Sequence, residues 1–254
     1  AYLATYNVDS PFGIGSQPDF KNSSQVIAGV DQSGISLPDR DYYIKDDDKS
    51  KTIRQDYVKH IAKVFQLMGD DAEKADAESK TVMEIETRLA GASLGRIELR
   101  NPYATYHVMT AEERKTLMPH FDWDAYLADC GLTGITTMNL STPKFFKEVD
   151  AMVVDIPIDK WKTYLRWRLV NYLSPNLSEP FENENFDFFS RELAGTKEQA
   201  PVWKRAVSAT SFRLGEAVGQ VYVKRYFPPE SKQRIEKLVS NLRAALRDDI
   251  EHLD

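Results

Sequence analysis

The residues that most often bind metals or drive hydrolysis are few in this chain and lie far apart. Its 254 residues include one cysteine and four histidines, no two of the histidines within five positions: His60, His107, His120 and His252. Zinc hydrolases often place two imidazoles and a carboxylate on one helical face as His-Glu-x-x-His, and this motif is absent. Gly-x-Ser-x-Gly and Walker-type motifs are absent too. We therefore assign no catalytic, cofactor-binding or metal-ligating residue to this chain.

Two weaker candidates have simpler explanations. Asp56 and His60 are one helical turn apart, and we interpret them as a surface ion pair and not as part of a metal site. Cys130 precedes Gly131 at the end of a short helical pattern, and we interpret it as a small buried hydrophobe and not as a reactive thiol. A single cysteine also excludes an intrachain disulfide.

Composition restricts the class of protein. The chain is 42% hydrophobic and 28% charged, so it can bury a full core as one or two domains. Its net charge of -6 argues against nucleic-acid binding, which requires a basic face. No apolar run approaches the roughly 20 residues of a membrane span, so we expect none in this segment.

The hydrophobic pattern predicts one hairpin followed by helices. Residues 12–16 and 25–30 flank a polar turn at 19–23, which is typical of a β-hairpin. From Ser50 onward apolar residues recur at helical spacing, first at Ile53, Tyr57, Ile61, Val64 and Met68. The sequence therefore predicts a mainly α fold with a small N-terminal β-hairpin.

Several local signals predict where helices begin and end. Asp71 can cap one helix, Thr110 and Glu113 have capping-box spacing, and Gly69 can end the helix that precedes Asp71. Further helices are expected to open at Pro157, near Pro201 and near Pro229. The apolar stripe of the last one runs to the end of the sequence without a capping residue, so we expect the polypeptide to continue.

Aromatic residues supply the large anchors. Trp123, Trp161, Trp167, Trp203 and the phenylalanines of 181–189 are expected in the core, although an interface with another domain uses the same residue types. Gly215 and Gly219 lie four apart on a helix, a spacing that lets another element approach closely.

An ordered set of segments resembles the neprilysin and endothelin-converting-enzyme family of zinc metallopeptidases. The set covers essentially the whole chain. We call its members landmark segments. They are Gln32–Tyr43, which contains Ser-Leu-Pro-Asp-Arg-Asp-Tyr-Tyr, then Glu86–Ala90, Arg100–Pro102 with Tyr106 and Met109-Thr110, Phe121–Trp123 with Tyr126-Leu127, Trp161–Trp167, Trp203–Arg205 and Leu214–Gly219 with Tyr222-Val223.

This resemblance implies a two-lobed enzyme whose helical cap lobe limits access to a chamber, while a catalytic lobe carries zinc. It implies a hairpin and connector at 1–35 and the cap lobe at 36–254, with the zinc motif outside these residues. The complete enzyme would then be a zinc metalloendopeptidase that cleaves short peptides, and this chain alone would be inactive and bind no zinc. Its partners would be the catalytic lobe of the same polypeptide and peptide substrates, not nucleic acid.

The chain departs from vertebrate members of the family in its cysteines. Ala206 follows Trp203–Arg205 where a cysteine is common in the family, and no disulfide is possible. This favours a bacterial member in an extracytoplasmic location: periplasmic, secreted or anchored to the envelope. Within the landmark at 36–43 we expect Asp39, Arg40 and Asp41 to form a local carboxylate–guanidinium brace above Tyr42 and Tyr43.

A second hypothesis belongs to another class of protein. The chain can be a free-standing helical module that binds peptides or a protein partner without catalysis. An isolated lobe should instead expose an apolar patch larger than the few hundred Å² usual for a monomer.

Overall fold

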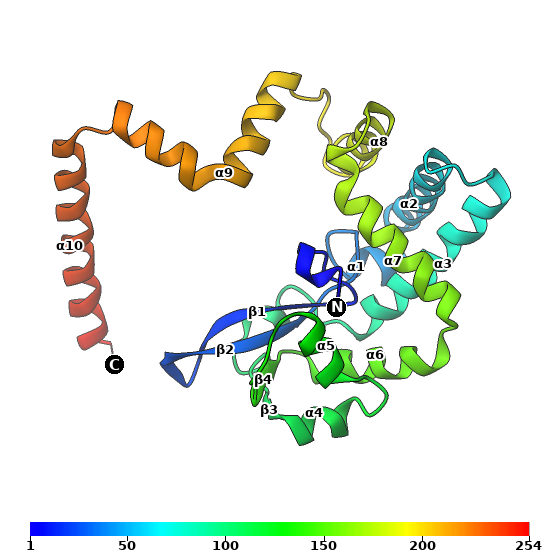
Figure 1. Cartoon of the computed structure of the whole chain (residues 1–254), viewed down its shortest axis with the longest axis horizontal. Coiled ribbons are helices and arrows are strands. Elements are labelled where there is room, and N and C mark those ends of the chain that lie inside the picture. Colours follow the sequence, from blue (N-terminus) through cyan, green and yellow to red (C-terminus); the bar gives the residue numbers. More distant parts are fainter. Residues whose placement is uncertain (254) are drawn as a thin grey trace. The chain divides into compact units, whose positions relative to one another are not determined.

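The computed structural model describes residues 1–253, and the chain divides into two units, Ala1–Lys197 and a second that starts at Glu198. The first contains a four-stranded sheet and helices α1–α8, and the second contains α9 and α10 (Figure 1). The expected mainly α fold with an N-terminal hairpin is confirmed.

The sheet is larger than the hairpin that the sequence predicts. Strands β1 (Phe12–Asp19) and β2 (Asn22–Gln32) form the expected antiparallel pair, with a register shift between Pro18 and Asp19. Strand β4 (Thr137–Leu140) joins β2 in parallel, and β3 (Val108–Thr110) pairs antiparallel with β4. The order is β1-β2-β4-β3, so β1 is an edge strand.

The described part of the first unit contains eight α-helices. They are α1 (Asp41–Ile44), α2 (Asp48–Leu67), α3 (Ala72–Ala92), α4 (Ala111–Leu117), α5 (Trp123–Asp129), α6 (Pro143–Asp155), α7 (Ile158–Leu173) and α8 (Glu179–Asn185). Short 3₁₀ turns lie at Ala4–Tyr6, Glu98–Arg100 and Ser174–Asn176, and a π-helix at Phe186–Glu192 follows α8.

The helix starts agree with the local signals. Asp71 accepts a hydrogen bond from the Lys74 backbone, and Thr110 and Glu113 form the complete capping box of α4. Such caps satisfy backbone N–H groups that have no partner within the helix. Pro157 precedes α7 as expected.

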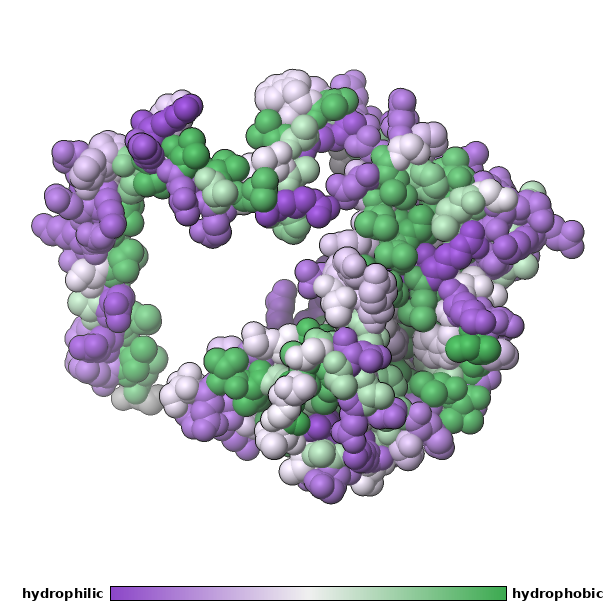
Figure 2. Space-filling view, viewed as in Figure 1, coloured by the Kyte–Doolittle hydropathy of each residue, from purple (hydrophilic) through white to green (hydrophobic). Residues whose placement is uncertain are grey.

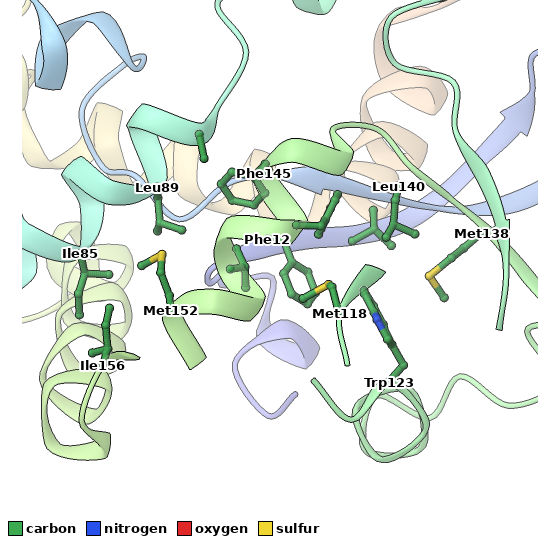
Figure 3. Packing of buried hydrophobic residues seen from close by; sticks show 14 of the residues in the cluster. Phe12, Ile85, Leu89, Met118, Trp123, Met138, Leu140, Phe145, Met152 and Ile156 are labelled. Atoms are coloured by element: carbon green, nitrogen blue, oxygen red, sulfur yellow. The ribbon is translucent and has the colours of Figure 1, made fainter. Parts of the chain in front are cut away.

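Two hydrophobic clusters form the interior of the first unit. One lies between the sheet and helices α3, α5 and α6, and Figure 3 shows Phe12, Leu140, Phe145 and Trp123 gathered there. The other packs α2, α3 and α7 around Tyr57, Phe65 and Trp167 with the π-helix residue Phe188.

Helices α3 and α7 contribute to both clusters. Ile85 and Leu89 of α3 pack in the sheet-side cluster, whereas Val82 packs in the helical one. On α7, Tyr164 belongs to the first cluster and Trp167 to the second. A displacement of either helix therefore disturbs both clusters.

The second unit consists of two helices whose described residues include none that is buried. Helix α9 (Val202–Tyr226) has non-helical dihedral angles at Leu214, where it kinks, and α10 is Pro229–Glu251. The helices begin at Pro201 and Pro229 as predicted. A side chain built on Gly215 or Gly219 would meet nothing within 4 Å, so the described residues show no close approach at this pair.

Gly34 is a position that requires glycine. Its φ is +86°, and a Cβ there would lie 2.6 Å from the Pro11 carbonyl oxygen and 2.6 Å from the Tyr164 hydroxyl. That hydroxyl donates a 2.7 Å hydrogen bond to the Gly34 carbonyl, which ties α7 to the segment after β2.

We expect Gly34→Ala to lower the free energy of unfolding by about 3 kcal/mol, from the left-handed backbone and the overpacking together. Gly134→Ala is the matched control, because Gly134 has φ +75° but open space around its Cβ, so only about 1 kcal/mol should be lost. Urea denaturation followed by tryptophan fluorescence measures both. Equal losses would contradict the steric argument.

Candidate functional site

A buried carboxylate lies where several landmark segments meet. Glu86 of α3 is 0% exposed. The hydroxyls of Ser36, Tyr43 and Tyr57 donate to it over 2.7, 2.6 and 2.8 Å, and the Ser36 backbone N–H donates over 3.2 Å. These four donors come from the 36–43 segment and from α2, both well before Glu86 in the sequence, and they compensate the cost of burying the carboxylate.

Helix α7 completes this network. The Trp167 indole N–H contacts the Tyr57 hydroxyl at 3.0 Å and the Ser36 hydroxyl at 3.2 Å. Arg168 donates to the Ser36 hydroxyl over 2.9 Å and also to the Asp9 carbonyl over 3.0 Å. The network therefore joins the N-terminal loop, the 36–43 landmark, α2, α3 and α7.

The surroundings of this network favour the neutral form of its two tyrosines. Burial raises the pKa of Tyr43 and Tyr57 well above the usual value near 10, and the neighbouring Glu86 carboxylate raises both further. Burial opposes the charge of Arg168, but Tyr164 and Glu86 outweigh it and raise the Arg168 pKa overall. The tyrosines remain neutral donors at physiological pH. We call this group the Glu86 network.

The prediction that Asp39, Arg40 and Asp41 form a local carboxylate–guanidinium brace is wrong. Asp39 pairs with Arg96 at 3.0 Å and Asp41 with Lys45 at 2.9 Å. Arg40 has a buried Nε without a hydrogen-bond partner among the described residues. The landmark is held by Glu86 through Ser36 and Tyr43, because a buried carboxylate attracts donors more strongly than exposed neighbours attract one another.

The interpretation of Asp56 and His60 as a surface ion pair is also wrong. His60 is 3% exposed, and its Nδ1 lies 2.9 Å from a Glu184 carboxylate oxygen, while Asp56 pairs with Lys59 at 2.7 Å. The imidazole stacks on the Phe188 ring at 4.7 Å between centroids. His60 therefore fastens α8 and the π-helix to α2.

The remaining candidate ligands are dispersed. His120 Nδ1 lies 2.8 Å from an Asp150 carboxylate oxygen. Cys130 is a free cysteine that is half-buried, so it is more exposed than the buried hydrophobe that we expected. Within residues 1–253, no three histidine, cysteine, aspartate or glutamate side chains converge as a metal site would require. In the same residues, no helix is both long enough and apolar enough to cross a bilayer.

An apolar hollow of about 510 Å³ lies between the N-terminal turn, the α5 entry and helices α6 and α7. Phe121, Val149, Ile156, Trp161 and Leu165 line it together with the first three residues of the chain. Its size is within the range of small-ligand pockets.

The expected aromatic anchors divide into two groups. Trp123 and Trp167 are buried and Trp161 lines the hollow, whereas Trp203 is 65% exposed. From the sequence, Glu86 was recognised only as part of the Glu86–Ala90 segment, and its role as a buried hydrogen-bond acceptor was not predicted. The available signal was a charged residue between Val82, Ile85 and Leu89 on the apolar face of a helix.

Comparison with known proteins relates the whole chain to one family. A family model described as peptidase family M13 matches residues 1–254. Neprilysin-3 of Drosophila melanogaster is 28% identical over 98% of this chain, and endothelin-converting enzyme 1 of Homo sapiens is 27% identical over 98%. In both cases the chain spans only 33% of the relative's length.

Solved structures agree with this relation. A zinc metalloprotease of Mycobacterium tuberculosis in complex with an inhibitor is 30% identical, with a TM-score of 0.87 over 99% of this chain and 38% of its own. The same protein in an open state is 31% identical, with a TM-score of 0.86.

We expect Glu86→Ala to lower the free energy of unfolding by about 3–5 kcal/mol, because three hydroxyls and the Ser36 backbone N–H lose their shared acceptor. Glu84→Ala on the same helix is the control: Glu84 is 59% exposed and pairs with Lys160, so its loss should be below about 1 kcal/mol. Chemical denaturation measures both, and a small loss for Glu86→Ala would mean that the network does not stabilise the unit.

The raised tyrosine pKa values predict an alkaline loss of stability. Above pH 10 the unfolded chain loses tyrosine protons that the folded chain keeps, so the free energy of unfolding falls as pH rises. Each such tyrosine contributes about 1.4 kcal/mol per pH unit. Tyr57→Phe should reduce the slope between pH 10 and 11 by about this amount, and Tyr103→Phe, whose ring is 89% exposed, should not. An unchanged slope in Tyr57→Phe would contradict the assignment.

Proposed function

This chain belongs to peptidase family M13, and from that premise we propose that it forms the helical cap lobe of a zinc metalloendopeptidase that cleaves short peptides. The observation that carries the proposal is the match along the whole chain to one third of the length of its relatives. The lobe would wall a chamber and limit the size of entering peptides, and the rest of the polypeptide would carry the catalytic lobe.

The residues at hand do not fit the zinc that the family implies. A hydrolytic zinc site needs three converging protein ligands and an open position. His60 and His120 each contact one carboxylate, and they belong to separate parts of the first unit. We therefore propose that the zinc ligands lie outside residues 1–253, and we assign no catalytic step to these side chains.

The Glu86 network would serve this role by fixing the shape of the lobe. A wall that selects substrates by size needs helices held at constant separations. The Tyr57 hydroxyl of α2 donates to the Glu86 carboxylate of α3, and Trp167 of α7 donates to that same hydroxyl, so the network connects the three helices. We place the complete enzyme outside the cytoplasm, since the family resemblance and the single cysteine suit a bacterial protein stabilised by packing.

A free-standing binding module is the second candidate function. The hollow beside Trp161 and Phe121 favours it, because its volume and apolar lining suit a bound side chain or small ligand. Such a module would bind peptide with no zinc and no hydrolysis.

The test compares the 254-residue chain with the longer polypeptide encoded by its natural gene. We expect the longer protein to hold about one zinc ion per chain, measured by metal analysis, and to cleave short unstructured peptides. A chelator should abolish cleavage and added zinc should restore it. The 254-residue chain is the matched control and should show neither property. Stoichiometric zinc and cleavage in the short chain, or neither in the long one, would overturn the proposal.

A further inference from the structure

We propose that the outer edge of strand β1 binds an extended peptide through backbone hydrogen bonds, so that the peptide becomes an added strand of the sheet. The inference rests on the proposed function for the source of the peptide, which would be a substrate of the complete peptidase. Every residue of this edge belongs to the first unit.

The two edge strands of the sheet differ in length. Strand β3 is limited to Val108–Thr110 and leads directly into α4, whereas β1 runs from Phe12 to Asp19. Within residues 1–253, β2 is the one element that lies along β1, and Figure 1 shows β1 on the outer side of the hairpin. A long edge of this kind is where an extended peptide can add to a sheet.

A hydrogen bond on the other side of β2 shows which backbone groups of β1 face outward. The Ser141 N–H, just after β4, donates to the Val30 carbonyl over 3.0 Å, so the backbone groups of Val30 point toward β4. Backbone groups alternate in direction along a strand, so the residues on either side of Val30 bond to β1. Ile14 and Ser16 lie opposite Val30 and Ala28, and their N–H and C=O groups therefore face away from β2.

These outward groups have no hydrogen-bond partner in the described part of the chain. None of the backbone hydrogen bonds outside the helices and strands involves Ile14 or Ser16. Ser16 is exposed, whereas Ile14 is half-buried because its side chain packs against the sheet-side cluster. A peptide strand would therefore find two donors and two acceptors on a backbone that the core already holds in place, which reduces the entropic cost of binding.

The side chains beside this edge leave room for a further strand. A Cβ built on Gly15 would meet nothing within 4 Å. The Gln17 side chain lies against Gly29 of β2, away from the outer edge. Pro18 has no N–H, so the site ends before it, and Phe12–Gln17 matches about six residues of an extended peptide at about 3.3 Å per residue. Figure 2 shows purple residues around the hairpin tip and mostly white or green residues between the tip and the rest of the sheet.

Recognition through the backbone defines the class of ligand. Backbone hydrogen bonds do not depend on the side chains of the peptide, so the edge would accept extended peptides of varied sequence. The carboxylates at its two ends, Asp9 and Asp19, have Asp31, Arg168 and Lys21 as charged neighbours. Three carboxylates against two cations slightly favour a basic or neutral peptide over an acidic one.

A second copy of this chain is a less suitable occupant of the edge than a peptide. Stable interfaces between folded proteins bury about 1,200 Å² or more. A pairing restricted to Phe12–Gln17 spans only about 20 Å of strand and would bury far less. A short peptide needs no larger area, because its backbone follows the edge along its whole length.

The test uses the purified 254-residue chain and a labelled peptide of about eight residues that alternates threonine and valine, with a lysine at each end. A second peptide has the same side chains but is methylated at every central amide nitrogen, so it cannot donate to the edge. Fluorescence anisotropy gives each Kd. We expect the methylated peptide to bind at least about tenfold more weakly, since each lost backbone hydrogen bond costs about fivefold.

A pair of variants tests the edge from the side of the protein. S16P removes one outward N–H and no hydrogen bond to β2, so it should weaken binding of the unmethylated peptide about fivefold. S16A is the matched control and should stay within about twofold of the unchanged chain, because it keeps that N–H. Far-UV circular dichroism checks that both variants are folded, and the two peptides decide the question without S16P if it is not.

Hydrogen exchange locates the bound peptide. Saturating peptide should slow amide exchange in residues 12–17 and leave β3 unchanged. Equal affinity for the two peptides, no binding, equal affinity of S16P and S16A, or protection elsewhere would overturn the proposal. Protection of β1 that rises with chain concentration in the absence of peptide would assign the edge to a second copy and also overturn it. Zinc content and peptide cleavage of the longer protein are separate measurements, so failure here is distinguishable from failure of the proposed function.

Discussion

The fold of the first unit depends on compensating one buried negative charge. A carboxylate that leaves water loses several kcal/mol unless donors replace its hydration. Glu86 is fully buried and obtains those donors from Ser36, Tyr43 and Tyr57. The position of the chain between β2 and α1 is therefore set by a residue of α3, and the landmark at 36–43 is ordered because it must reach that carboxylate.

The two hydrophobic clusters are organised around this network. Helices α3 and α7 supply Glu86, Trp167 and Arg168 and also contribute apolar residues to both clusters. The hydrogen bonds fix the spacing of these helices, and the apolar contacts supply most of the stabilisation. A rigid lobe of this kind agrees with the wall that we propose for an M13 peptidase.

Local features could be predicted from the sequence, and distant ones could not. The hairpin, the Thr110 capping box and the starts of α7, α9 and α10 depend on residues a few positions apart, so spacing alone indicates them. The parallel pairing of β2 with β4 joins segments about a hundred residues apart. The partners of His60 and Asp39 also lie far along the chain, at Glu184 and Arg96. The predictions that paired each of these residues with a neighbouring charge were therefore wrong. The family resemblance located Glu86 but gave no reason for its burial.

The β1 edge of the sheet has a consequence for the isolated chain. Among the described strands, β1 pairs with β2 alone, so its outer backbone groups could template pairing with a strand of another molecule. Pro18 removes one N–H from this edge, and the register shift beside it increases the local twist. These two features hinder the addition of a further strand at the Pro18 end of β1.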